Sequence, residues 1–224
     1  DMASYLKEID PYDHHIVLHT YPNQQDSIYP KLLGPEYSLT GLSLQNSWSS
    51  SHQRIIQWNK ASKEAGKQWV VAHDEQNPHY TGVPPDEGYE GFSGLVDHEK
   101  VEPYTLHDIR KYTLWGTFMA GGAGVEYYFG YTLPQNDLGC QDWRSRDESW
   151  KYAAIALEFF NQYIPFWEME NRNDLIENPE NTNEKYCLAK PGEMYLVYLP
   201  NGGTTDLNLE NLSQSYSIRW FNPR

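Results

Sequence analysis

The sequence predicts an α/β fold in which half of an eight-fold barrel is followed by a small, partial β-sandwich-like module. Between residues 10 and 165 strand and helix patterns alternate four times, and such βα crossovers imply parallel strands. An eight-fold barrel usually takes about 250 residues, so four units make half of one. After residue 171 the pattern changes to short strands with hairpin turns. We therefore expect two domains, residues 1–170 and residues 171–224.

The first three strands and the helix between the second and third follow from apolar periodicity. Strands are expected at residues 14–21 and 39–45. The serines at 49–51 can cap a helix whose core face carries Ile55, Trp58, Ala61 and Ala65. Gly66 is placed to end that helix. The apolar run Trp69 to Ala72 then predicts a third strand that is buried on both faces.

The remaining elements are predicted from capping and turn residues. A Gly- and Pro-rich acidic loop is expected at 77–103, and Thr105 with Asp108 forms a capping pattern for the helix that follows. A fourth strand is expected at 125–129. Ser145 and Glu148 form a capping box for a last helix. Its expected core face consists of Trp150, Ala153, Ala154, Leu157 and Phe160, and the later strands are expected at 185–188, 193–199 and 216–220.

Composition excludes some classes of function. The formal net charge of −14 and the pI near 4.9 argue against binding to a phosphate backbone, so no nucleic-acid partner is expected. No run of eighteen apolar residues occurs, so no membrane span is expected. Aromatic residues make up 15% of the chain and many lie in polar stretches, which suits either stacking on sugar rings or ordinary core packing. Cys140 and Cys187 could pair or be two unrelated thiols.

Polar side chains stand at the expected carboxyl ends of all four strands, where α/β barrels keep their functional groups. These residues are His19, Tyr21, Asn46, Trp48, His73, Asp74, Glu75, Tyr127, Tyr128 and Tyr131. Asp74 and Glu75 are neighbours, so their side chains should point to opposite sides of a strand. We expect Glu75 to enter the site and Asp74 to orient its surroundings. Trp143 could shape a sugar subsite or only anchor its loop.

Other interpretations of these residues stay open. The Asp-Glu pair could be a helix cap or a hydrogen-bonding hub in a loop. His19 and His73 could bind a metal, but no spacing typical of a zinc site is present, so hydrogen bonding is favoured and no metal is expected. The acidic stretch 136–142 could bind calcium, although it lacks the regular ligand spacing of a known loop.

Three segments carry a resemblance to a known family: residues 10–21 (DPYDHHIVLHTY), 69–77 (WVVAHDEQN) and 115–130 (WGTFMAGGAGVEYYFG). Residues Tyr5 to Trp167 resemble the C-terminal half of bacterial clan-A glycoside hydrolases of the apiosidase-like, endoglucanase-like type. Residues from about Asn183 resemble the small β domain, labelled collagen-binding, that follows such barrels. The resemblance implies that the four units are strands five to eight of the barrel.

The resemblance also implies a retaining mechanism in which Glu75 is the nucleophile and no cofactor takes part. His19, Tyr21, Asn46, Trp48, His73, Asp74, Tyr128 and Trp143 would line the substrate site. The acid/base glutamate of such enzymes belongs on a fourth strand that this sequence lacks. We therefore expect a fragment, inactive alone, whose partners are a carbohydrate substrate and the N-terminal half of the same barrel, missing here or supplied by another chain.

Three functions follow as expectations. The first is hydrolysis of a polysaccharide or oligosaccharide by a secreted or periplasmic enzyme. The second is non-catalytic binding of carbohydrate or matrix on a barrel scaffold. The third, ranked last, is metal-dependent hydrolysis by His19, His73 and Asp74.

Overall fold

The computed structural model describes residues 2–209 and 215–224. Its helices are α1 (Met2–Ile9), α2 (Gln25–Ile28), α3 (Ser51–Glu64), α4 (Leu106–Asp108), α5 (Trp115–Met119) and α6 (Asp147–Tyr163), and the π-helix η4 (Ile109–Leu114) joins α4 to α5. Short 3-10 turns are η1 (Pro22–Gln24), η2 (Tyr29–Leu32), η3 (Tyr89–Gly91), η5 (Trp143–Arg146), η6 (Phe166–Glu168) and η7 (Asn173–Ile176). The strands are β1 (Val17–Thr20), β2 (Gly41–Asn46), β3 (Val70–Gln76), β4 (Leu95–His98), β5 (Val101–Thr105), β6 (Glu170–Asn171), β7 (Tyr186–Lys190) and β8 (Met194–Tyr198).

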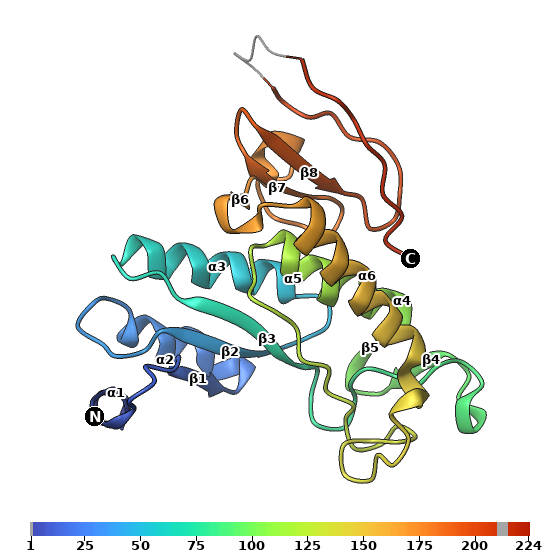
Figure 1. Ribbon diagram of the computed structural model, residues 1–224. Coiled ribbons are helices and arrows are strands. Elements are labelled where there is room, and N and C mark those ends of the chain that lie inside the picture. Colours follow the sequence, from blue (N-terminus) through green and yellow to red (C-terminus); the bar gives the residue numbers. More distant parts are fainter. Residues whose placement is uncertain (1, 210–214) are drawn as a thin grey trace.

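The first three predicted strands form a parallel sheet in the order β1-β2-β3 (Figure 1). Helix α3 connects β2 to β3, and Gly66 follows it with a positive φ of 88°, as expected for a glycine after a helix end. One face of the sheet is covered: Leu42, Leu44 and Val71 pack with Ile55 and Trp58 of α3 in one hydrophobic cluster.

The other face of the parallel sheet is open. Side chains alternate along a strand, so Val17, Val70 and their in-register neighbours point away from α3. Val17 is 48% exposed and Val70 is 40% exposed. The prediction that the third strand is buried on both faces is therefore wrong.

The prediction of half a barrel is also wrong. The fourth expected strand, 125–129, makes a single parallel bridge, Val125 to His73. Beyond this bridge, backbone pairing with β3 stops. The N–H of Tyr128 donates to the side-chain Oε1 of Gln76, and the carbonyl of Tyr128 accepts the N–H of Val83. In the described residues the strands form three small sheets, and no continuous barrel of alternating strands and helices exists.

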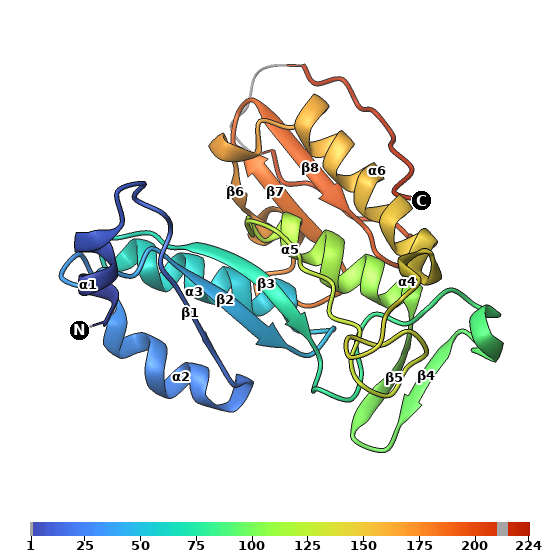
Figure 2. The ribbon, with the colours of Figure 1, turned by 60° about the horizontal axis from the view of Figure 1, so that its bottom comes forward.

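The loop predicted at 77–103 contains an antiparallel hairpin, β4-β5. After the hairpin, the Thr105–Asp108 capping box is confirmed. The side chain of Thr105 accepts the backbone N–H of Asp108, and the carboxylate of Asp108 accepts the backbone N–H of Thr105. The helix that it opens continues as α4, η4 and α5 (Figure 2).

The prediction for α6 is wrong in its cap and in part of its core face, although Phe160 is buried as expected. Helix α6 follows η5, whose N-cap is Asp142, and the N–H of Glu148 donates to the carboxylate of Asp86 instead of to Ser145. The residues buried along α6 are Ser149, Tyr152, Ala156, Phe159 and Phe160, whereas Leu157 is 51% exposed. The helix is thus rotated relative to the expectation, because its core partners are Trp115 on α5 and the C-terminal sheet.

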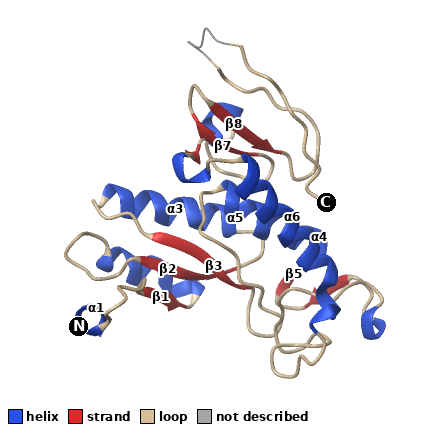
Figure 3. Ribbon diagram, in the orientation of Figure 1, coloured by secondary structure: helices blue, strands red, loops and turns tan. Residues whose placement is uncertain are grey.

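Strands β6, β7 and β8 form an antiparallel sheet that packs on α5 and α6. In Figures 1 and 2 this sheet and the parallel sheet lie on opposite sides of α3 and α5. The strand predicted at 216–220 does not form, and the chain after β8 runs as loop in its described parts (Figure 3). The smaller β-sandwich-like module is therefore, as described, a single three-stranded sheet.

Candidate functional site

A bulge at the end of β3 decides which carboxylate reaches the open face. Ser43 pairs with Ala72 and Leu44 with His73, but Gln45 pairs with Glu75. Asp74 therefore has no partner on β2. Without this shift, alternation from Ala72 would place Asp74 on the open face and Glu75 on the α3 side. The bulge therefore puts Glu75 in the row of Gln45, beside the row of His19, Ser43 and Ala72.

Glu75 is held by two side chains of neighbouring strands. Its Oε1 accepts a hydrogen bond of 2.6 Å from Nε2 of Gln45, and its Oε2 lies 3.5 Å from Nε2 of His19. Nδ1 of His19 lies in turn 3.0 Å from Oγ of Ser43. Burial raises the pKa of Glu75 above its usual value, and the nearby His19 opposes that shift.

A second set of polar groups faces Glu75 from the loops. The charge of Asp137 adds to the rise in the pKa of Glu75, and His79 lowers it. Oδ2 of Asp137 accepts the backbone N–H groups of Phe129 and Gly130. Tyr128 donates its hydroxyl to the carbonyl of His79, and its pKa is raised by burial first and by Tyr131, Glu75 and Asp137 in addition. The site is thus an acidic, partly desolvated cluster at the carboxyl ends of β1–β3.

Three of the predicted site residues point into the core instead. His73 is fully buried and its Nδ1 is 2.8 Å from Oγ of Ser51 at the start of α3. Burial lowers the pKa of His73 to about 4. Asn46 is buried and bonded by Gln25, and Trp48 packs against Tyr104 and Tyr112.

The other predicted residues lie around the edges. Asp74, at the bulge, is close enough to Tyr29 on the covered side to raise the pKa of that phenol, after the larger effect of burial. Tyr21 is exposed at the start of η1. Trp143 is 64% exposed, and its carbonyl accepts the indole N–H of Trp150. Tyr127, also at the expected fourth strand end, packs against Trp150.

Sequence reasoning missed Ser43, Gln45 and Asp137. The signal for the first two was available, since Ser43 and Gln45 are polar residues two apart in one strand and so should share a face. Asp137 gave no comparable signal, because its place near Glu75 depends on how the 130–137 loop folds back.

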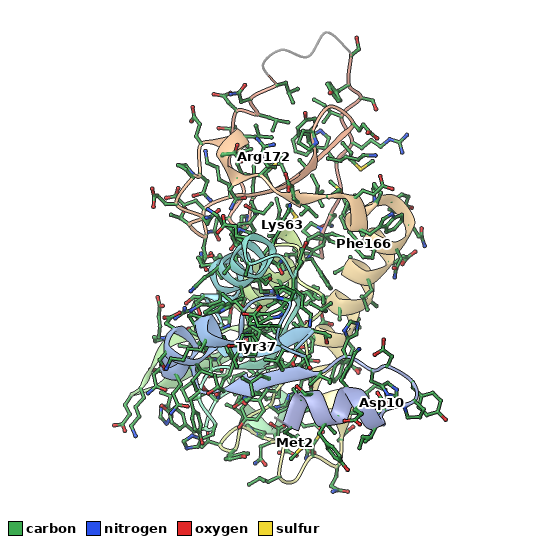
Figure 4. All side chains as sticks on the ribbon, turned by 90° about the vertical axis from the view of Figure 1, so that its left-hand side faces the viewer. Met2, Asp10, Tyr37, Lys63, Phe166 and Arg172 are labelled. Carbon is green, nitrogen blue, oxygen red and sulfur yellow. The ribbon has the colours of Figure 1, made fainter. Side chains whose placement is uncertain are left out.

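A groove of about 260 Å³ lies beside the β7–β8 hairpin. It is lined by Arg172, Leu175, Pro191, Gly192, Tyr195, Asn208 and Leu209. The hydroxyl of Tyr195 accepts the N–H of Gly192, and its ring meets that of Tyr216 edge-on with 5.6 Å between centroids. Figure 4 shows Arg172 in the upper part of the molecule and Met2 and Asp10 in its lower part. The groove and the Glu75 cluster are separate sites.

Neither a metal site nor a disulfide is found in the part of the chain that the structure describes. No group of three or more His, Cys, Asp or Glu side chains in residues 2–209 and 215–224 could hold a metal ion. Asp142, in the stretch considered for calcium, is bonded to Arg144 and Tyr89, and Arg144 lowers its pKa to about 2. Cys140 and Cys187 are both free thiols. Among the described helices, none has the length and apolar character needed to cross a membrane.

Residues 172–224 match the family described as "Putative collagen-binding domain of a collagenase". No curated protein and no solved structure matches the chain. The matched segment begins at η7 and includes β7, β8 and the lining of the groove. The comparison therefore covers the C-terminal part of the resemblance seen in the sequence, and the glycoside hydrolase part stays a prediction.

Proposed function

We propose that this protein binds a polymer of the extracellular matrix, or a carbohydrate, through residues 172–224. The observation that carries the proposal is the match of these residues to a family described as collagen-binding. The groove beside β7–β8 supports it, because Tyr195, Pro191 and Leu175 offer an aromatic and apolar surface next to the guanidinium of Arg172. Collagen chains have the polyproline II conformation, and aromatic-lined grooves commonly bind such chains. A secreted or periplasmic location belongs to this proposal.

A binding assay on immobilised collagen, gelatin and neutral polysaccharides tests the proposal. We expect saturable binding to at least one polymer, reduced tenfold or more by Tyr195→Ala, and unchanged by Tyr12→Ala, which removes an exposed aromatic outside the groove. Tyr195→Phe removes only the hydroxyl and separates loss of the ring from loss of the hairpin contact. Glu75→Ala should leave binding intact. Absence of binding to every polymer would refute the proposal.

The Glu75 cluster supports a second candidate function, the retaining hydrolysis of a glycosidic bond. In that mechanism one carboxylate is the nucleophile and a second, about 5 to 5.5 Å away, is the acid/base. Glu75 suits the first role, since Gln45 and His19 fix its orientation on an accessible face. The proposed substrate is a polysaccharide or oligosaccharide, and Tyr128 lies near enough to contact it.

An activated glycoside inhibitor tests this second candidate. A leaving group that needs no proton makes labelling depend on the nucleophile alone, so the acid/base carboxylate is not required. We expect mass spectrometry to find the glycosyl adduct on Glu75 and no adduct after Glu75→Gln. Ordinary glycosides should not be turned over by the 224-residue chain. Labelling at another residue, or none, would contradict a nucleophilic Glu75.

A further inference from the structure

The open face of the parallel sheet carries a hydrogen-bonded row that ends at Glu75. Ser43 Oγ lies 3.0 Å from Nδ1 of His19, and Nε2 of the same ring lies 3.5 Å from Oε2 of Glu75. The three residues come from three adjacent strands, and His19 and Ser43 are direct partners in the β1–β2 register. The row is therefore fixed by the sheet.

The chemistry of a hydroxyl explains why a serine suits this place. When His19 is neutral, the Ser43 hydroxyl can donate to Nδ1, which leaves the proton of the ring on Nε2, facing Glu75. When His19 is protonated, Nδ1–H donates to the same oxygen, because a hydroxyl also accepts. In both states an N–H of His19 points to Glu75. An apolar side chain at this position could form neither hydrogen bond.

We propose that Ser43 is a positioning residue that keeps the Nε2–H of His19 directed at Glu75 and so governs the charge of that carboxylate. The role of the carboxylate rests on the glycoside hydrolysis proposed above. The geometry of the row does not depend on it.

The other groups around Glu75 give the direction of the effect. From β1, His19 lowers the pKa of Glu75; from the loops, His79 lowers it and Asp137 raises it; and Gln45 on β2 lowers it through a hydrogen bond. Tyr128 faces the same carboxylate, and the charge of Glu75 raises the pKa of the Tyr128 hydroxyl. If His19 turns away, the largest of the lowering influences is lost while burial and Asp137 remain. The carboxylate then holds its proton to higher pH.

A matched pair of variants, Ser43→Thr and Ser43→Val, tests the inference. The two side chains have the same shape and both suit a strand, but only threonine has the hydroxyl. The measurement is a titration of the Glu75 side-chain carboxyl by carbon-13 NMR on the full chain without substrate. We expect the midpoint to move upward in Ser43→Val and in His19→Gln, and to stay at the wild-type position in Ser43→Thr.

Equal midpoints in Ser43→Val and Ser43→Thr would overturn the inference, as would an unmoved midpoint in His19→Gln. Ser43→Ala gives a further comparison should the larger side chains disturb the sheet. Because no substrate is present, this outcome is independent of inhibitor labelling. Labelling can fail while the midpoints shift, and the reverse is equally possible.

Discussion

The parallel sheet β1–β2–β3 and the antiparallel sheet β6–β7–β8 lie on opposite sides of α3, and they use polar residues in opposite ways. The parallel sheet displays His19, Ser43 and Glu75 on an open face. Where the antiparallel sheet meets α3, by contrast, the polar contacts are buried. A ligand can reach the first set, whereas the second set fixes how the C-terminal region is held.

The junction is a buried network around His52 and Asn173. Nε2 of His52 accepts from the amide of Asn173 at 2.8 Å, and Nδ1–H of His52 donates to the Gly116 carbonyl at 2.8 Å. The amide oxygen of Asn173 accepts the N–H of Cys187 on β7, and Tyr186 stacks on the His52 ring with 3.9 Å between centroids. These contacts tie the segment that matches the collagen-binding family to α3. We therefore expect the two regions to unfold together.

Acid should have the largest effect on stability, because strand β3 of the parallel sheet and the junction at α3 each contain a buried neutral histidine. Burial lowers the pKa of His52 and of His73 to about 4 each. The folded chain thus binds fewer protons than the unfolded chain, so stability is full above about pH 6.5 and is lost as the pH falls toward 4. Each histidine contributes about 3 kcal/mol to that loss. Urea unfolding between pH 7 and pH 4 measures it.

The matched variants of this prediction are His52→Gln and His107→Gln. His52→Gln should make the dependence of the free energy of unfolding on pH less steep. His107→Gln, at an exposed histidine of α4, should leave that slope unchanged. A flat wild-type profile between pH 6.5 and pH 4 would contradict the neutral burial of both rings.

Asn173→Ala should have the next largest effect on stability, because it removes the central hydrogen bonds of the junction. It leaves the N–H of Cys187 and Nε2 of His52 without their partner in a fully buried place. We expect a loss of about 2–4 kcal/mol in the free energy of unfolding, measured in urea at pH 7. Asn222→Ala at an exposed site should cost under about 0.5 kcal/mol. Separate transitions for the two sheets would contradict joint unfolding.

Glu75→Gln should change the stability at pH 7 by less than Asn173→Ala does, and it should raise the stability instead of lowering it. The raised pKa of Glu75 means that the folded chain favours the protonated form, so its stabilisation is full below about pH 4.5 and is lost as the pH rises through the folded-state value. The glutamine variant lacks that loss and should melt higher than wild type at pH 7, with the difference closing toward pH 4.5. Glu102→Gln on β5 is the exposed control. An equal difference at both pH values would argue against a desolvated Glu75.

Lys63→Ala should have the smallest effect. Lys63 on α3 lies 3.3 Å from Glu170 on β6, but both side chains are mostly exposed. Such pairs are screened by water and salt and contribute less than about 1 kcal/mol. A double-mutant cycle with Glu170→Ala in urea measures the coupling. A coupling well above that value would show that ion pairs, and not the buried network alone, hold the junction.

The sequence by itself determined what depends on neighbouring residues. Apolar periodicity located β1, β2, β3 and the Ile55–Trp58 face of α3, and the caps at Thr105 and Gly66 are where local chemistry predicts them. It also predicted that acidic residues end the third strand. Each of these features needs only the residues within about one turn or one strand.

Only the tertiary structure decided what depends on pairing between distant segments. The bulge opposite Gln45 turns Glu75 and not Asp74 to the open face, and the contact of Tyr128 with Gln76 and Val83 ends the sheet before a barrel can form. The rotation of α6 follows from Trp115 and the C-terminal sheet. The physical reason is that register and closure are set by partners far along the chain, which a local pattern does not contain.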